Sequence, residues 1–421
     1  MDGRKLIQII DKTNTESKLG ILIEQKMKIA LISTAFFKIS GRFNNVKNRV
    51  KYLQDIEDVD LDVFLLRIKD DFFHKFLIKR KQMPIEEITE IDGIKYKNFW
   101  VDYGMVDSIF TNILGCRDIM CKSQLESFVP MFSNYDIIIA HSLKGKYIAY
   151  RAKEQFSIPY INGWHGSDLN IEPFKTKKKF NLHKQLINAA DYNLFVSKKL
   201  LEKSNEFTDS KNRAVSYSGV PSTFYPYEQS VRSQLKMEYN LSSKYIIGFV
   251  GILKPVKNIL VLPAIFKEVQ KRLGDVSFVI VGDGKLFDKF KLLVEELEIN
   301  NVLFMGKVEP SKIPKIINCF DLMVLPSLNE GLPLVTLEAL ACGVPVVGSN
   351  VGGIPEAIGE ENTFELNKEF EKNISNRVIE ILIHKEKPKK LSDDFSWEKT
   401  IKDLVKLCEK IVSNNYSTDK N

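Results

Sequence analysis

The 421-residue sequence has only five cysteines, and they are scattered without the paired spacing of a zinc site or a disulfide framework. They are Cys116, Cys121, Cys319, Cys342 and Cys408. No uncharged apolar run reaches the roughly 18 residues that a membrane-spanning helix needs, and residues 1–11 lack the apolar core of a secretory signal. We therefore expect reduced thiols in a cytoplasmic protein.

The chain also lacks internal repeats and low-complexity tracts. Its 44% hydrophobic and 27% charged residues are typical of globular domains, and its length suits two or three of them. Residues 1–26 are polar and irregular, and the first apolar run follows Met27. We expect these residues to be an N-terminal appendage, or translation to begin at Met27.

The net charge of +7 is small but unevenly distributed. Residues 1–240 hold 37 Lys and Arg against 29 Asp and Glu, whereas residues 241–421 hold 24 against 25. The excess includes the clusters Lys79-Arg80-Lys81 and Lys175, Lys177, Lys178, Lys179. It indicates either a solvated face or a surface that approaches an anionic membrane or a phosphate-bearing acceptor. Because no nucleic-acid motif is present, we expect no nucleic-acid partner.

From residue 27 onward, short apolar runs that are typical of buried parallel strands alternate with helical stretches. Tyr135–Ala140 and Tyr245–Val250 are such runs. Leu262–Leu273 has the apolar spacing of a helix, with Gly274 as its C-terminal cap. Repeated strand–helix units predict an α/β fold of two doubly wound, Rossmann-like domains that face a cleft.

We place the domain boundaries where this pattern changes. The N-terminal domain is expected at residues 27–225, a linker at 226–243 and the C-terminal domain at 244–394. A C-terminal helix is expected at 395–421, because its apolar residues recur at helical spacing.

The segment Pro326–Gly343 is the richest in functional residues. A strand ends, a loop carries Glu330, and a helix follows with Glu338 inside it. The amides of Leu334 and Val335 fall in the first helical turn, where unpaired donors and the helix dipole favour an anion. A phosphate could sit there between two carboxylates. The alternative is structural, with Glu330 capping the helix and Glu338 solvated.

Two further loops follow predicted strands. Gly251–Asn258 is expected to open a helix with Lys257 at its start, where the dipole opposes a cation, so an anionic ligand would explain the lysine. Gly282–Gly284 is a tight turn. Because the carboxyl ends of parallel strands share one edge, the three loops can converge on one cleft.

These residues resemble the nucleotide-sugar domain of the retaining glycosyltransferases of family 4, the group 1 glycosyl transferases. The resembling segments are Phe249–Lys257, Val281–Gly284, Phe304–Val308, Glu330–Gly343 with its two glutamates, and Gly343–Glu356. Looser matches in the first half are His165–Asp168, Val196–Ser197 and Ser218–Pro226. The resemblance implies a GT-B fold, with an N-terminal acceptor domain, a C-terminal donor domain and a last helix, from Phe395 on, that returns to the first domain.

The resemblance also implies catalytic roles. Glu330 would contact the donor sugar hydroxyls on the reacting face, and Lys257 would neutralise the departing diphosphate. His165 would lie near the reacting carbon, with a purely structural turn histidine as the alternative.

For donor binding, the resemblance implies that Glu338 holds the ribose hydroxyls, that the amides of Leu334 and Val335 bind the diphosphate, and that the main chain at Val308 meets the base. The other donor-binding positions supplied by the motifs are Gly41, in the glycine loop after the first strand, Gly251, Gly331 and Leu332.

One departure from the family pattern concerns the diphosphate. Ile252 occupies the place of an arginine, so either Lys254 or Arg42 substitutes or phosphate binding is weaker. Asp58-Val-Asp60 and Asp60-Leu-Asp62 match a metal-binding Asp-x-Asp by letter, but we interpret them as surface charge. We expect no metal and no cofactor besides the nucleoside diphosphate sugar as donor substrate.

The expected function is therefore a metal-independent hexosyltransferase. It would move a hexose-type sugar to a glycan or lipid-linked acceptor in bacterial-type surface polysaccharide or glycolipid synthesis, in the cytoplasm or at the inner face of the cell membrane. Two alternatives are a GT-B binding subunit with little or no turnover and a sugar-nucleotide epimerase of the same architecture.

Overall fold

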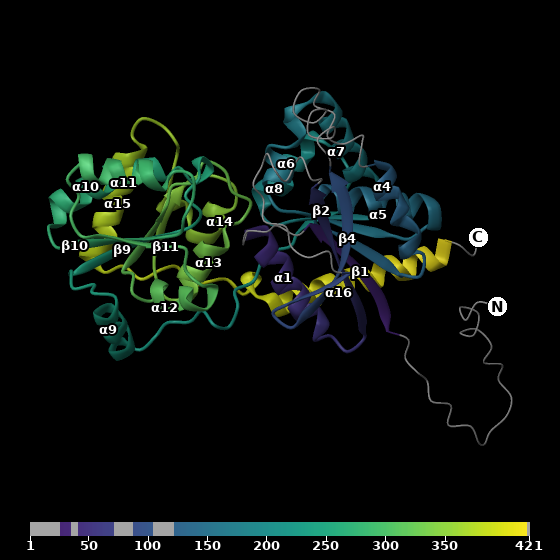
Figure 1. Ribbon diagram of the computed structural model, residues 1–421, viewed down its shortest axis with the longest axis horizontal. Coiled ribbons are helices and arrows are strands. Elements are labelled where there is room, and N and C mark those ends of the chain that lie inside the picture. The colour runs from purple at the N-terminus through teal and green to yellow at the C-terminus, as the bar shows by residue number, and fades with distance from the viewer. Residues whose placement is uncertain (1–25, 35–40, 71–86, 104–121, 419–421) are drawn as a thin grey trace, which may run out of the picture.

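The computed structural model describes residues 26–34, 41–70, 87–103 and 122–418 and contains two α/β domains (Figure 1). The cluster Lys79-Arg80-Lys81 and the residues Cys116 and Cys121 lie outside these ranges. Within them, no helix is both long and apolar enough to cross a membrane.

The first domain is built on an eight-stranded sheet with the order β3-β4-β2-β1-β5-β6-β7-β8. Neighbouring strands are parallel except β3 and β4. The strands are β1 (Met27–Thr34), β2 (Val59–Asp70), β3 (Ile88–Ile91), β4 (Ile94–Tyr103), β5 (Ile137–Ala140), β6 (Tyr160–Trp164), β7 (Tyr192–Phe195) and β8 (Arg213–Val215). The helices are α1 (Gly41–Gln54), α4 (Lys122–Ser127), α5 (Leu143–Phe156), α6 (Ser167–Asn170), α7 (Lys177–Ala189) and α8 (Lys198–Lys203). The central strands β5 and β6 are fully buried, which explains their unbroken apolar runs.

The second domain has a six-stranded, wholly parallel sheet with the order β11-β10-β9-β12-β13-β14. The strands are β9 (Tyr245–Val250), β10 (Val276–Val281), β11 (Val302–Gly306), β12 (Leu322–Leu325), β13 (Val346–Ser349) and β14 (Thr363–Phe364). The helices are α10 (Leu262–Leu273), α11 (Phe287–Glu296), α12 (Ile313–Ile317), α13 (Leu334–Ala341), α14 (Ile354–Ile358) and α15 (Phe370–His384). The predicted strand at β9 and the helix at α10, with Gly274 at its C-terminus, are confirmed.

The stretch 226–243, which we expected to be a linker, contains helix α9 (Gln229–Glu238). Arg232 donates hydrogen bonds to the carbonyls of Asn318 and Phe320, and Lys236 pairs with Asp321. These contacts fasten α9 to the second domain (Figure 1). The helix was missed because it buries only Leu235 and therefore has almost no apolar face to recognise.

The last helix, α16 (Trp397–Thr418), returns to the first domain and lies beside α1, as the resemblance implies (Figure 1). Ile401 and Leu404 are buried there against the first sheet. The chain therefore crosses between the domains twice, once before β9 and once before α16. The two crossings touch, because the amide of Val220 donates to the carbonyl of Phe395 at 3.2 Å.

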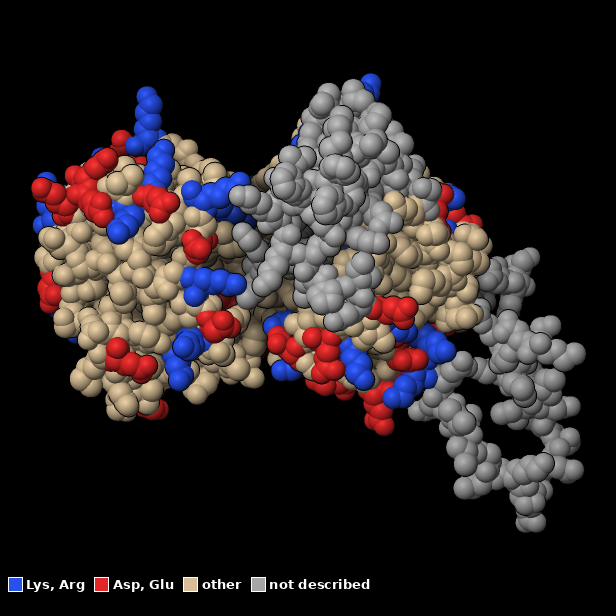
Figure 2. Space-filling view, in the orientation of Figure 1, with Lys and Arg blue, Asp and Glu red and all other residues tan. Residues whose placement is uncertain are grey.

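Surface charge is mixed. Figure 2 shows basic and acidic side chains interspersed over the visible face of the second domain. In the first domain, Lys175 and Lys179 both pair with Glu172, whereas Lys177 and Lys178 are exposed. Part of the basic cluster is thus neutralised by its own neighbour.

Candidate active site

The loop between β12 and α13 carries Glu330 at the carboxyl edge of the second sheet. Helix α13 begins at Leu334, so the amides of Leu334 and Val335 lie in its first turn, where a helix offers them no internal acceptor. The buried side chain of Leu332 anchors the loop just before the helix. The positive end of the helix dipole and two backbone donors therefore lie next to Glu330 in the chain.

Lys257 and Glu330 form an ion pair. The distance from Lys257 Nζ to Glu330 Oε1 is 2.6 Å, and the side chains are 17% and 14% exposed. The expected position of Lys257 at a helix start is wrong. It ends a 3₁₀ turn, Pro255–Lys257, and α10 begins only at Leu262, so the dipole argument for an anion does not apply to this lysine.

The loops that follow β9, β10 and β11 are joined to one another. The amide of Gly251 donates to the carbonyl of Val281, and the amide of Gly282 donates to the carbonyl of Gly306. The amide of Leu253 reaches the carbonyl of Asp283. Leu328, in the loop of Glu330, donates its amide to the carbonyl of Val256. The three loops expected to converge, at Gly251–Asn258, Gly282–Gly284 and Pro326–Gly343, therefore meet at one edge of the sheet.

Glu338 lies on the second turn of α13 and is half-buried. No described side chain forms a hydrogen bond or ion pair with its carboxylate. Burial raises the pKa of Glu338 to about 7. The group therefore titrates near neutral pH, which is unusual for a carboxylate without a function.

The remaining donor-binding candidates of the second domain lie along the same sheet edge. Val308 is half-buried just beyond β11. Ile252 is exposed after β9, and burial together with the neighbouring Lys257 ammonium lowers the pKa of Lys254.

In the first domain, Gly41 is the first residue of α1, and the side chain of Arg42 lies outside the described residues.

The Asp-x-Asp candidates lie far from this edge in the fold. Asp58, Asp60 and Asp62 are at the amino end of β2, the opposite edge of the first sheet from the ligand-binding one. Asp62 pairs with Lys97 at 2.7 Å. In the described part of the chain, no three His, Cys, Asp or Glu side chains are placed together to hold a metal ion.

In the first domain, His165 follows β6 in a loop that a buried ion pair holds. The Asp168 carboxylate accepts hydrogen bonds from the amides of His165 and Gly166, both at 2.9 Å. Its other oxygen lies 3.1 Å from Nζ of Lys146, which is fully buried and 3.3 Å above the centre of the Trp164 ring. Contacts within the first domain therefore hold the backbone of His165 in place.

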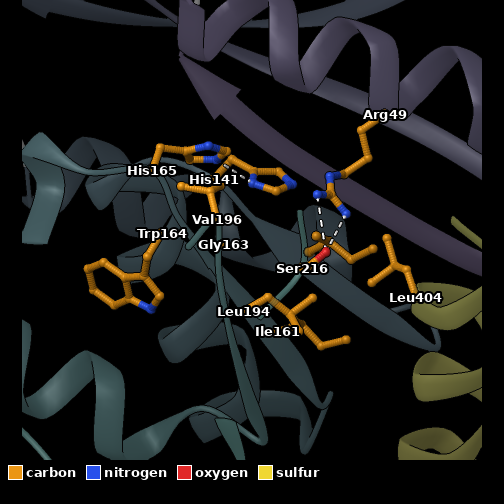
Figure 3. Close-up of a pocket in the computed structure, with 11 residues that line it drawn as sticks. Arg49, His141, Ile161, Gly163, Trp164, His165, Leu194, Val196, Ser216 and Leu404 are labelled. Carbon is orange, nitrogen blue, oxygen red and sulfur yellow. Dashed lines mark hydrogen bonds between the residues drawn. The ribbon is translucent and has the colours of Figure 1, made fainter. Parts of the chain in front are cut away.

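A second histidine contacts His165. Nδ1 of His141 lies 2.9 Å from Nε2 of His165 (Figure 3). Burial is the main cause that lowers the pKa of His141 well below its usual value, so the ring is neutral at physiological pH.

The domains meet at the predicted residues. The Glu330–Gly331 backbone packs against His165 and Gly166, and a Cβ atom on Gly331 would lie 2.0 Å from the His165 carbonyl oxygen. Nearby, Asn170 donates to Asn329 at 3.1 Å. The structure therefore brings the three catalytic candidates, His165, Lys257 and Glu330, to one junction.

A second interdomain contact lies beside this junction. The carboxylate of Glu356, on α14, accepts hydrogen bonds from the amides of Lys198 and Lys199 at the start of α8. It also accepts one from the Tyr217 hydroxyl at 2.7 Å. A side chain of the second domain thus caps a helix of the first.

Sequence reasoning assigned no role to His141, Lys146, Asp168 or Glu356. His141 directly follows the buried run of β5, and this position at the carboxyl end of a parallel strand is a signal that could have identified it. The partners of Lys146 and Glu356 depend on tertiary contacts and leave no local pattern.

Comparisons with known proteins find a matching family model over the second domain and relatives over the whole chain. Residues 232–395 match the family model of glycosyl transferases group 1, a range that contains Lys257, Glu330 and Glu338. The chain is 28% identical over 396 residues to an uncharacterized glycosyltransferase of Methanocaldococcus jannaschii, covering 91% of this chain and 99% of that protein. It is 31% identical over 241 residues to N-acetyl-alpha-D-glucosaminyl L-malate synthase of Bacillus anthracis, covering 56% of this chain and 62% of that enzyme.

Solved structures share the fold at low sequence identity. Sucrose-phosphate synthase from Thermosynechococcus elongatus superposes with a TM-score of 0.69 at 17% identity, covering 92% of this chain and all of that one. HepE from Anabaena, in complex with UDP and glucose, superposes with a TM-score of 0.66 at 18% identity, covering 93% of this chain and all of that one. The chain therefore has the GT-B fold, and the matched family model and relatives support a group 1 glycosyltransferase.

Proposed function

We propose that this chain is a retaining, metal-independent glycosyltransferase. It would move a hexose-type sugar from a nucleoside diphosphate sugar to a glycan or lipid-linked acceptor, as in bacterial surface polysaccharide or glycolipid synthesis. The observation that best supports this function is the meeting of the Lys257–Glu330 ion pair with the His165 loop of the other domain.

The reaction breaks the bond between the anomeric carbon and a phosphate oxygen. Negative charge grows on the diphosphate while the sugar becomes an oxocarbenium-like cation. In the proposed mechanism, Lys257 and the first-turn amides of Leu334 and Val335 stabilise the leaving group. These groups are already in position, so they reorganise little during the reaction.

Glu330 has two tasks in this mechanism. Its carboxylate accepts hydrogen bonds from donor hydroxyls, and its ion pair with Lys257 holds that side chain beside the proposed diphosphate position. Retention follows if the acceptor attacks from the face that the leaving group vacates, with a phosphate oxygen accepting the acceptor's proton.

Relatives suggest which donor to test first. HepE is described in complex with UDP-glucose as well as with UDP and glucose. Another relative is named for N-acetyl-glucosaminyl transfer. We therefore propose a uridine diphosphate hexose or N-acetylhexosamine as the donor.

The test combines binding with turnover. The full chain is incubated with uridine, guanosine and adenosine diphosphate sugars, and thermal stabilisation identifies the donor. Release of nucleoside diphosphate is then measured with lipid-linked glycan extracts, and the anomeric configuration of the product is read by NMR. We expect stabilisation and release with a uridine diphosphate sugar; neither effect with any donor would exclude the function.

One observation favours a second candidate. Ile252, exposed after β9, supplies no charge where the resemblance expects an arginine. A chain that is stabilised by a donor but releases no diphosphate with any acceptor would be a binding subunit rather than an enzyme.

A further inference from the structure

A small buried cavity lies beneath His165 in the first domain (Figure 3). Its lining includes Arg49 of α1, His141 after β5, His165 after β6 and Ser216 after β8. Arg49 and His141 are only 2% and 3% exposed. The free space is about 10 Å³, close to what one water molecule needs.

Arg49 is a buried cation to which the described residues offer no carboxylate. Its two Nη atoms lie 3.3 Å from Oγ of Ser216, its guanidinium carbon lies 5.7 Å from the centre of the Trp397 ring, and its Nε has no described hydrogen-bond partner. Burial lowers the pKa of Arg49 to about 10, so the group is still charged at neutral pH. A buried charge without an ion-pair partner is costly, which argues for a task beyond packing.

The ring of His141 lies between Arg49 and His165 (Figure 3). Nδ1 faces His165, whereas Nε2, on the side of Arg49, has no described partner. A Cβ atom on Gly163 would lie 2.2 Å from Nδ1 of His141. The bare glycine therefore lets the ring pack against the strand and keeps it in one place.

The position of the proton follows from the charges. A neutral imidazole carries one N–H and one lone pair. The positive charge of the Arg49 guanidinium attracts the lone pair of Nε2 of His141, either across the cavity or through one water molecule. The proton of His141 therefore resides on Nδ1. His141 then donates to Nε2 of His165, and a neutral His165 must carry its own proton on Nδ1.

We infer that Arg49 is a positioning residue that holds both histidines neutral with their protons on Nδ1 and thereby fixes the orientation of the His165 ring, whose backbone carbonyl packs against Gly331. The catalytic consequence rests on the proposed function. A neutral His165 can donate a hydrogen bond near the sugar without repelling the positive charge that develops there.

The pH behaviour depends on every charged group around His141. The cations Arg49 and Lys146 disfavour protonation of His141, as a protonated His165 would, and Asp168 favours it. Replacing Arg49 by a neutral side chain removes one of these repulsive charges. The histidine pair should then accept a proton at a higher pH than in the wild-type protein.

The experiment reads the tautomers directly. The full chain is labelled with ¹⁵N-histidine, and long-range ¹H–¹⁵N correlation spectra are recorded from pH 6 to 9 without any sugar nucleotide. Single His141→Gln and His165→Gln variants assign the signals. We expect Nδ1–H on both histidines of the wild-type protein, with no protonation of the pair across this range.

Arg49→Met is expected to move the His141 proton at least partly to Nε2 and to raise the pH at which the pair is protonated, whereas Arg49→Lys retains the wild-type pattern. Arg272→Met, at an exposed arginine of α10, is the control. Nε2–H on His141 in the wild type, or an unchanged Arg49→Met spectrum, would overturn the inference.

If Arg49→Met does not fold, the wild-type and Arg49→Lys spectra decide. The spectra need no substrate, so they can be interpreted even if the proposed function fails. If the enzyme is active, the acid limb of its pH–rate profile should move to higher pH in Arg49→Met.

Discussion

The carbonyl oxygen of His165 and the α-carbon of Gly331 approach so closely across the two domains that any side chain on Gly331 would collide with the carbonyl. The would-be Cβ atom lies 2.0 Å from that oxygen. Since the obstacle is backbone and not the end of a flexible side chain, the domains themselves would have to separate. The position of Glu330 relative to His165 therefore depends on the absence of one methyl group.

Gly331→Ala should lower turnover by roughly a hundredfold, because a displacement of about 1 Å at a reacting centre has that scale of effect. Stability should fall less, since the substitution removes no buried apolar side chain. Steady-state kinetics and thermal melting measure the two effects. Leu328→Ala, at an exposed side chain of the same loop, is the matched control. Wild-type turnover in Gly331→Ala would mean that the active form does not have this contact.

Lys257→Ala and Glu330→Ala should each reduce turnover at least about a hundredfold, the scale of losing a preorganised transition-state contact. Lys257→Ala should also weaken binding of free nucleoside diphosphate, whereas Glu330→Ala should act mainly on the sugar step. Diphosphate release and calorimetric titration separate these effects. Lys271→Ala, at an exposed lysine of α10, controls for loss of positive charge. Near-normal rates in both variants would place the site elsewhere.

Nucleotide affinity should increase with pH through the pKa of Glu338, which burial raises to about 7. If the carboxylate accepts hydrogen bonds from ribose hydroxyls, only its ionised form does so fully. Titration of the wild type at pH 6 and pH 8 should show tighter binding at pH 8. Glu338→Gln should weaken binding and remove the part of this pH dependence that does not come from the nucleotide's own phosphates.

The raised pKa of Glu338 also predicts how the stability of the fold changes with pH. A carboxyl group with a raised folded-state pKa binds more protons folded than unfolded, so its contribution is fully present below pH 4.5 and is lost as pH rises through 7. Glu338→Gln should therefore gain stability relative to the wild type at pH 8 and gain little at pH 4.5. Urea unfolding at the two pH values measures this difference, and equal gains would argue against burial as the cause.

Glu356→Ala should cost about 1–2 kcal/mol of stability, because two helix N-terminal amides of α8 lose their acceptor. Tyr217→Phe, which deletes one hydrogen bond to the same carboxylate, should cost about 1 kcal/mol. In the double variant the losses should not add, because both act through one carboxylate. Additive losses would show that the two residues act independently.

Lys146→Met and Asp168→Asn should each cost about 3–5 kcal/mol, since each leaves a buried charge or polar group without its partner. The double variant should be more stable than that sum predicts. Unfolding free energies of the four proteins give the coupling. Asp168→Asn should also lower turnover, because it weakens the acceptor that holds the His165 loop.

The elements of the second domain could be predicted because their signals are local. The apolar spacing of Leu262–Leu273 and the run Tyr245–Val250 depend only on neighbouring residues and on burial in a parallel sheet. Strand polarity alone then brings the loops at Gly251, Gly282 and Glu330 to one edge. Nothing further was needed to anticipate which loops share that edge.

Contacts between the domains could not be predicted in this way. The approach of Gly331 to His165 joins residues 166 positions apart and depends on how the two domains dock, where buried residues of both share one apolar cluster. The same is true of Glu356, whose carboxylate caps a helix of the other domain. Lys257 was misplaced for a local reason, because the 3₁₀ turn at Pro255–Lys257 delays the start of α10.

The double crossing of the chain between the domains has a mechanical consequence. The two connecting segments are bonded to each other where the Val220 amide meets the Phe395 carbonyl, so a movement of one connection is transmitted to the other. Any change in the angle between the domains should then bend both connections together. Such coupling would favour the return of Glu330 and His165 to one relative position.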